Sequence, residues 1–174
     1  LEKQTNSQFE TLKDSLEVLI SHNDFFLSSC DAYGMFDFKK FRKFTQAKNP
    51  DAVIFIFKPS LMQGKMSSYH SHVSIDEDRI TAVHIKSKCD PDDRGFAGFF
   101  WVKHGEIFNC IDEVPMDGDR EMLADHVFKN FVDSGKHVAC FELDRYIHIG
   151  SEEELLEYLY WKDRNYLFQQ SNTL

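Results

Sequence analysis

The chain has 174 residues, which is enough for one domain built around a single hydrophobic core. Its hydrophobic content of 42%, with 17 phenylalanines, favours an ordered core over disorder. The net charge of −9 argues against nucleic acid or an anionic membrane surface as a partner, and no apolar run approaches the roughly 18–20 residues that span a bilayer. Because no signal-peptide pattern opens the chain, we expect one cytoplasmic domain over residues 1–174.

Four cysteines, Cys30, Cys89, Cys110 and Cys140, lie far apart and form no C-x-x-C motif. Two of them lie in apolar stretches that are typical of strands or of a core. The pattern therefore fits the reduced thiols of a cytoplasmic protein better than disulfides.

The first third of the chain alternates between helical and extended patterns. Residues 7–20 and 37–47 carry apolar side chains at helical spacing, which predicts two helices. FFLS, residues 25–28, predicts a short buried strand. AVIFIF, residues 52–57, is apolar throughout, which predicts a strand covered on both faces.

The rest of the chain continues this alternation. HVSIDEDRITAVHIK, residues 72–86, has the pattern of a hairpin around an acidic turn. Strands are predicted at 97–102 and 137–143, and the apolar spacing over 119–134 predicts a helix that ends at a glycine. A final helix is predicted over 151–161.

Two S-x-x-E patterns indicate where helices begin. Ser7 with Glu10, and Ser151 with Glu154, have the spacing of a capping box, in which the two side chains bond backbone N–H groups at a helix N-terminus. Helices that alternate with strands apolar throughout predict an α/β fold. We expect a three-layer sandwich with a mostly parallel, mixed sheet between layers of helices.

A carboxylate, Asp31, follows the first predicted strand. In open α/β sheets, ligands bind beyond the carboxyl ends of the strands. A carboxylate in that position could hold a hard divalent cation, which would in turn bind phosphate oxygens. The alternative is an aspartate that caps a turn, and spacing alone favours this second interpretation.

A second candidate is the pair His70 and His72. Alternate residues of a strand share a face, so the two could bind a metal, although surface histidines that flank a strand are the more common case. The sequence contains neither G-x-x-x-x-G-K-[ST] nor G-x-G-x-x-G, the motifs that build phosphate-binding loops.

Several stretches resemble, in chain order, the motifs of one enzyme family. NSQFETLKDSL resembles a G-Q-x-x-T segment through Gln8 and Thr11, and FFLSSCDAYG resembles a strand that ends in a metal-binding aspartate, here Asp31. YHSHVSIDEDRITAVHIKSK resembles Y-G-x-V-x-x-D-x-x-G-x-I-x-x-x-x-E-K, with Lys86 on its lysine. FAGFFWVKHGEIF resembles a small-residue strand that contains Gly98.

The longest match begins at GDREMLADHVF and ends at ELLEYLYW. It resembles G-E-x-x-x-x-D followed by a helix, G-K-x-V, V-D-x-Y and G-T-P-E-D-L-x-x-Y, with Glu121 on the first glutamate. The matches together cover residues 5–161. The chain thus resembles the sugar-phosphate nucleotidyltransferases, which are NDP-sugar pyrophosphorylase-like enzymes, and within them the capsule and surface-polysaccharide type.

The resemblance implies a GT-A-like, nucleotide-diphospho-sugar transferase fold. It also implies an activity: an NTP and a sugar 1-phosphate would form an NDP-sugar for polysaccharide biosynthesis, with release of pyrophosphate. Asp31 and Lys86 would be the catalytic residues. Asp31 and His148 would bind the Mg²⁺ or Mn²⁺ cofactor.

The same resemblance implies which residues contact the substrates. Gln8 and Thr11 would lie near the nucleotide base, Gly98 would leave room for the sugar ring, and Glu121 would bind sugar hydroxyls. The partners are therefore an NTP and a sugar 1-phosphate, and a homo-oligomer is among the options for assembly.

Two departures from the family pattern define the alternatives. The family's Gly-rich loop with Arg and Lys is absent, so we expect the chain to begin about 70–90 residues into the family's domain and to be inactive alone. His148 replaces a second metal-binding aspartate. The main alternative is a degenerate, non-catalytic domain that binds an NDP-sugar or regulates a partner. A GT-A glycosyltransferase is a third option, but Tyr33 breaks the D-x-D motif usual in those enzymes.

Overall fold

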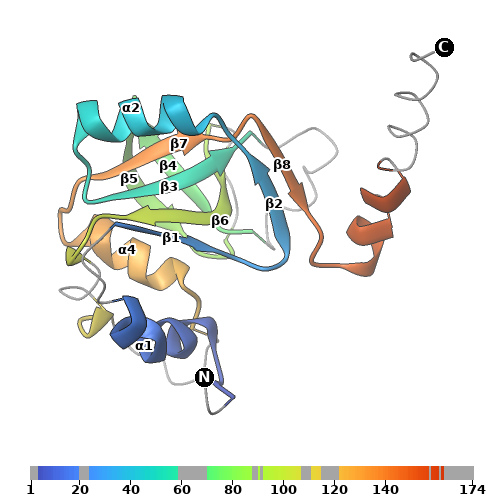
Figure 1. Cartoon of the computed structure of the whole chain (residues 1–174), viewed down its shortest axis with the longest axis horizontal. Helices are drawn as coiled ribbons and strands as arrows, with labels where there is room; N and C mark the ends of the chain where they lie inside the picture. Colours follow the sequence, from blue (N-terminus) through green and yellow to red (C-terminus); the bar gives the residue numbers. More distant parts are fainter. Residues whose placement is uncertain are drawn as a thin grey trace.

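Two sheets organise the protein. The computed structural model describes residues 4–19, 24–58, 70–87, 90, 92–106, 111–114, 122–156, 158–160 and 162. The main sheet has six strands in the order β1-β6-β3-β7-β5-β4, and β2 and β8 form a separate two-stranded ribbon (Figure 1). The strands are β1 (Phe25–Ser28), β2 (Ala32–Met35), β3 (Ala52–Phe57), β4 (His72–Asp76), β5 (Arg79–His84), β6 (Arg94–Val102), β7 (Val138–Glu142) and β8 (Arg145–His148). The helices are α1 (Gln8–Leu19), α2 (Phe38–Lys48) and α4 (Asp125–Asp133).

Strand β3 lies at the centre of the core, with every one of its residues buried. Alternate residues point to opposite faces of the sheet. Ile54 and Ile56 join a cluster that includes side chains of α1 and α4, whereas Val53 and Phe55 join a second cluster under α2. Figure 1 shows α2 above the sheet and both α1 and α4 below it. The expected three layers are thus present, and the prediction for 52–57 is confirmed.

The direction of the strands differs from the expectation of a mostly parallel sheet. The sheet is mixed, but among the described pairings β3–β7 is the one parallel pair. The pairs β1–β6, β3–β6, β4–β5, β4–β6 and β5–β7 are antiparallel. The expectation failed because a run of apolar residues reports cover on both faces of a strand, and this cover does not depend on the direction of its neighbours.

Strand β6 bends the sheet toward closure. It pairs with β1 and β3, and its first residues also pair with β4 through His72↔Gly95. Its register with β3 shifts between Ile54↔Phe100 and Ile56↔Phe96, which leaves extra residues of β6 around Gly98. An irregularity of this kind bends a strand and redirects its side chains. Gly98 lies inside the bulge.

Two phenylalanines that the sequence places in the core are largely exposed. Phe26, in β1, is 46% exposed, because β1 is an edge strand whose residues alternate between partly buried and exposed. Phe38, the first residue of α2, is 57% exposed, whereas Phe41 of the same helix is 2% exposed. The apolar pattern correctly located both elements but overestimated how far the core extends at their ends.

The predicted helix ends are largely present. Glu10 N donates to Ser7 Oγ at 3.1 Å, and Glu154 N donates to Ser151 Oγ at 3.2 Å, so each serine caps the helix that follows it. Helix α4 is shorter than the predicted 119–134, although residues 115–121 lie outside the described part of the chain. Gly135, with φ +79°, ends this helix as expected.

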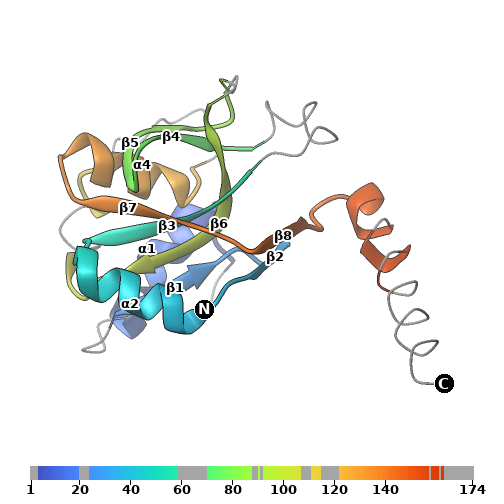
Figure 2. The same cartoon turned by 90° about the horizontal axis from the view of Figure 1, so that it is seen from above.

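The last predicted helix is present in part. Residues 152–156 and 158–160 are helical, and this segment projects away from the sheet in both views (Figures 1 and 2). Within the described residues, the structure contains no helix with the length and apolar character needed to cross a membrane. Cys30 and Cys140 carry free thiols, and the other two cysteines lie outside the described residues.

Helix α2 offers a matched test of the core. Phe41 stacks on Phe55 with ring centroids 5.1 Å apart and meets Phe141 edge-on at 5.3 Å. We expect Phe41→Ala to lower the free energy of unfolding by about 3–5 kcal/mol, because it leaves a cavity between these rings. Phe38→Ala, on the exposed first turn, should cost under about 1 kcal/mol. Equilibrium urea denaturation measures both, and equal losses would contradict the packing described here.

Candidate functional site

The β2–β8 ribbon forms the centre of the site. Ala32 pairs with His148, and Ile149 N donates to the Asp31 backbone oxygen at 2.8 Å. Asp31 Oδ2 therefore lies 3.7 Å from His148 Nε2, although the two residues are far apart in sequence. The sequence predicts neither strand of the ribbon, since AYGM and RYIH are four residues long and lack a clear apolar alternation.

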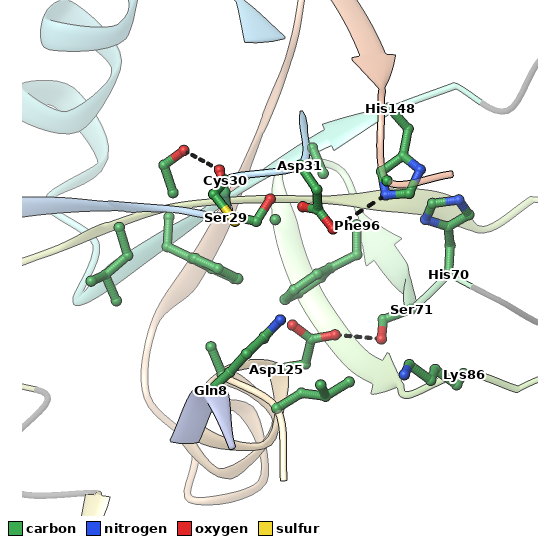
Figure 3. Close-up of a pocket in the computed structure, with 18 of the residues that line it drawn as sticks. Gln8, Ser29, Cys30, Asp31, His70, Ser71, Lys86, Phe96, Asp125 and His148 are labelled. Carbon is green, nitrogen blue, oxygen red and sulfur yellow. Dashed lines mark hydrogen bonds and ion pairs between the residues drawn. The ribbon is translucent and has the colours of Figure 1, made fainter. Parts of the chain in front are cut away.

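A cavity of about 1090 Å³ opens beside this ribbon. It lies between the start of α1, the end of β1, the β6 bulge, the start of α4 and the residues after β8. Figure 3 shows the side chains that face it. The structure brings together in this cavity most of the site residues that the family resemblance implies: Gln8, Thr11, Asp31, Lys86, Gly98 and His148. The remaining one, Glu121, lies outside the described residues.

Lys86 reaches the cavity from the loop after β5. Its φ is +41°, in the left-handed region that residues other than glycine seldom adopt. Such backbone conformations are costly, and they concentrate at functional sites. The unusual backbone of Lys86 therefore adds a structural reason to assign this lysine a role in the cavity.

The backbone conformation at Gly98, which lines the cavity, requires a glycine. Its φ is +71°, and a Cβ atom at this position would lie 2.7 Å from Ser29 Oγ. The Gly98 oxygen also accepts a hydrogen bond from Ser29 N at 2.9 Å. Gly98 thus fixes the position of Ser29, which follows β1 and lies two residues before Asp31. The expectation that it makes room for a sugar ring stays a prediction.

Two residues of α1 face the cavity differently. The Thr11 hydroxyl donates to the Ser7 backbone oxygen at 3.0 Å and also bonds the Thr5 hydroxyl, so it takes part in the helix start. Gln8 extends its amide into the cavity toward Asp125 (Figure 3). Of the two, Gln8 is the better placed for contact with a ligand.

Asp125, the first residue of α4, is a cavity residue to which the sequence assigned no role. Ser71 Oγ donates to Asp125 Oδ2 at 2.5 Å. Burial raises the pKa of the Asp125 carboxyl above its ordinary value of 3.8, against the opposing effects of Ser71, His126 and Lys86. A protonated carboxyl can both donate and accept hydrogen bonds, which suits it to a hydroxylated ligand. With Glu121 on its glutamate, the G-E-x-x-x-x-D pattern places its aspartate at His126, so the carboxylate one residue earlier, Asp125, is the signal that could have identified this residue.

A second group of polar residues lies on the opposite side of the same cavity. His148 Nδ1 is 2.8 Å from Glu154 Oε2, and the ring of His70 meets the ring of His148 edge-on, with centroids 4.7 Å apart. Figure 3 shows His70, His148 and Asp31 pointing toward one another. Ligand atoms of His70, His148 and Glu154 lie within 4.8 Å of one another. A metal ion could therefore bind in this corner of the cavity.

The expectation for the two histidines needs correction. His72 is buried in β4, where its ring stacks on that of His84 and its Nε2 lies 3.6 Å from Asp93. His70 precedes β4 and turns into the cavity. The two side chains therefore neither share a metal nor lie at the surface together, because the strand begins only at His72.

The ionisation of this group follows from its surroundings. Burial lowers the pKa of His70, and the nearby His148 lowers it further, so the His70 ring is neutral near pH 7. Desolvation opposes the ionisation of Glu154, but hydrogen bonds from Ser151 and His148 outweigh it and lower the pKa of this carboxyl. Glu154 is thus an anion that accepts hydrogen bonds from a histidine ring.

Gly150 permits the close approach of these groups. A Cβ atom at this position would lie 2.6 Å from His148 Cε1 and 3.2 Å from Asp31 Oδ2. Any larger residue would displace the imidazole, the carboxylate or the backbone. The glycine of the predicted G-T-P-E-D-L pattern therefore serves to hold Asp31 and His148 together.

The charge of the cavity is unbalanced. Asp31, Asp125, Glu153 and Glu154 contribute four carboxyl groups, and Lys86 is the one lysine or arginine among the described residues that line it. A bound phosphate would meet more carboxylate than cationic charge, even with Asp125 protonated. Additional positive charge from a metal ion would resolve this imbalance.

Comparisons with known proteins identify the fold. The sequence matches no family model and no curated protein. The structure resembles a nucleoside-diphosphate-sugar pyrophosphorylase from Vibrio cholerae with a TM-score of 0.69 at 15% identity over 91% of this chain. It resembles a UDP-glucose pyrophosphorylase solved with UDP-glucose, with a TM-score of 0.71 at 16% identity over 92% of this chain. It also resembles the inositol-1-phosphate CTP transferase from T. maritima, with a TM-score of 0.61 at 17% identity over 85% of this chain.

These neighbours confirm, at the level of the fold, the resemblance that the sequence motifs indicate. The chain has the α/β fold with a mixed sheet of nucleotide-sugar pyrophosphorylases and related nucleotidyltransferases. It covers 67%, 64% and 57% of the lengths of the three neighbours, respectively.

The raised pKa of Asp125 predicts a pH-dependent stability. Between the ordinary pKa of 3.8 and the higher folded value, the carboxyl is protonated when folded and ionised when unfolded, so rising pH favours unfolding. Asp125→Asn abolishes this ionisation. The variant should gain stability relative to the wild type as pH rises above about 4, by at most about 1.4 kcal/mol per pH unit. Urea denaturation from pH 3.5 to 8 measures the difference, with the lowest pH as the internal control. A difference that does not change with pH would contradict the burial argument.

Proposed function

We propose that this chain carries the sugar-phosphate- and metal-binding part of a nucleotidyltransferase that makes an NDP-sugar from an NTP and a sugar 1-phosphate. The observation that carries the proposal is the cavity. The motifs of this family point to six described residues that lie far apart in the sequence, and all six line this one cavity: Gln8, Thr11, Asp31, Lys86, Gly98 and His148. NDP-sugar pyrophosphorylases share the fold that brings them together.

The reaction needs no protein nucleophile. An oxygen of the sugar 1-phosphate attacks the α-phosphorus of the NTP, a new P–O bond forms, and the bond to the β-phosphate oxygen breaks to release pyrophosphate. Catalysis of such a step depends on positioning and on the neutralisation of charge. A bound divalent ion supplies positive charge that offsets the phosphate oxygens.

Asp31 and Lys86 have complementary parts in this proposal. Asp31, together with His148, holds the ion just beyond the C-terminal end of β1, where both side chains line the cavity. Lys86 is a point cation on the opposite wall and offsets the charge of the sugar phosphate. Gln8 reaches from α1 toward the nucleotide base, with Thr11 one turn further along.

The sugar occupies the part of the cavity between the β6 bulge and the start of α4. Gly98 offers a wall without a side chain, and the Ser71–Asp125 pair offers hydrogen bonds to sugar hydroxyls. Glu121, which lies outside the described residues, stays a predicted contact of the sugar hydroxyls. The product would be an activated sugar donor of the kind that the synthesis of a capsule or another surface polysaccharide consumes.

The test is turnover by the natural protein and its Asp31→Ala variant. We expect the natural protein to release pyrophosphate from an NTP and a sugar 1-phosphate, and the variant to lose at least about two orders of magnitude in kcat/KM, since a preorganised charge contact is removed. Asp144→Ala is the matched control, because this exposed carboxylate directly precedes β8 but does not line the cavity. Near-normal turnover by Asp31→Ala would overturn the role of this residue.

The same turnover assay, together with calorimetry, distinguishes the proposed enzyme from the main alternative, a non-catalytic domain. A non-catalytic domain would bind an NDP-sugar without pyrophosphate release, and its affinity in calorimetry would not depend on Mn²⁺. An enzyme of the proposed kind should bind the NDP-sugar more tightly when Mn²⁺ is present, and Asp31→Ala should remove that gain.

A further inference from the structure

His70, which the sequence offers as a metal ligand only in a pair with His72, lies beside the two predicted metal ligands Asp31 and His148. His70 lies two residues before β4, whereas Asp31 follows β1 and His148 ends β8. Three separate segments thus direct a carboxylate and two imidazoles into one corner of the cavity (Figure 3). Phe57 packs against the His70 ring at 6.3 Å, nearly perpendicular to it, and so supports the orientation of this imidazole.

The hydrogen bonds of His148 fix which ring nitrogen faces the others. Glu154 Oε2 accepts from Ser151 N at 3.1 Å and from Ser151 Oγ at 2.9 Å, and it lies 2.8 Å from His148 Nδ1. A carboxylate accepts hydrogen bonds and does not donate them, so the proton resides on Nδ1. In the neutral imidazole, Nε2 then carries the lone pair, and this nitrogen faces Asp31. A carboxylate behind a histidine in this way is typical of metal sites.

The distance between Asp31 Oδ2 and His148 Nε2 also fits a metal site. Asp31 Oδ2 and His148 Nε2 are 3.7 Å apart, which exceeds the range of a hydrogen bond of about 2.7–3.2 Å. Two ligands that each lie about 2.1 Å from one ion, at a tetrahedral angle, are about 3.4 Å apart. The observed separation therefore needs only a small adjustment to accommodate an ion between the two atoms.

We propose that Asp31, His70 and His148 bind one transition-metal dication, such as Mn²⁺, Co²⁺ or Zn²⁺, in preference to Mg²⁺, with Glu154 as the positioning residue. Mg²⁺ prefers carboxylate and water oxygens, whereas imidazole nitrogen suits the borderline transition metals. This inference rests on the proposed function, because it names the ion that would face the phosphates. A site with two imidazoles would therefore prefer a different ion from a site in which two aspartates bind the metal.

Metal binding to the purified chain tests the inference directly. Co²⁺ is the probe, because its visible absorption reports nitrogen coordination, and Mg²⁺ is the competitor. We expect one Co²⁺ per chain that millimolar Mg²⁺ does not displace. His70→Ala should weaken Co²⁺ binding at least about tenfold and change the visible spectrum. His70→Gln is the second variant if the alanine form fails to fold, and His104→Ala, beyond the far end of β6, is the matched control.

Glu154→Gln distinguishes a positioning residue from a ligand. This change keeps an acceptor for His148 Nδ1 but removes the negative charge, so Co²⁺ affinity should fall about 10–100-fold while the shape of the spectrum is retained. Mg²⁺ binding as tight as Co²⁺ binding, or unchanged Co²⁺ affinity in both His70 variants, would overturn the inference.

The failure of this inference can be told apart from failure of the proposed function. If Co²⁺ binds with the expected dependence on His70 but no pyrophosphate is released by the natural protein, the metal site stands and the function falls. If the natural protein turns over with Mg²⁺ and His70→Ala has no effect on turnover or on Co²⁺ binding, the function stands and the transition-metal site falls.

Discussion

The pairing of β2 with β8 is the constraint on which the candidate site depends. Its register sets Ala32 opposite His148, and the hydrogen bond from Ile149 N to the Asp31 oxygen extends this pairing by one step. The ribbon thus holds Asp31, which follows β1, against the end of β8. Gly150 then allows the carboxylate and the imidazole to approach, because a side chain there would collide with both.

A helix-capping residue has a second role in this cavity. The Ser151–Glu154 capping box satisfies backbone N–H groups at the beginning of a helix, and the same Glu154 oxygen orients His148. A local motif that any helix could use thus determines which imidazole nitrogen faces Asp31. On the other wall, burial raises the pKa of the Asp125 carboxyl, which accepts a hydrogen bond from Ser71. One cavity therefore combines a cluster of carboxylates and imidazoles suited to a cation with a buried carboxyl and hydroxyl pair suited to hydroxyl groups.

The sequence predicted those parts of the structure that have a strong local signal. The fully apolar AVIFIF strand, the two serine caps and the helix that ends at Gly135 are of this kind. Asp31 was singled out as a carboxylate at the end of an apolar strand, but its metal-binding role is implied only by the resemblance to family motifs, since spacing alone favoured a turn cap. The prediction of a mostly parallel sheet was wrong, because burial on both faces of a strand carries no information on the direction of its neighbours.

The remaining features depend on contacts between distant segments. The strands of the ribbon are too short for a periodic pattern, and the approach of His70 to His148 follows only from the bend of β6 and the pairing of β8. The most direct test of the account is anomalous diffraction from the protein crystallised with Mn²⁺. We predict one manganese peak bounded by Asp31, His70 and His148. Manganese bound elsewhere, with these three side chains left in contact only with water, would contradict the account.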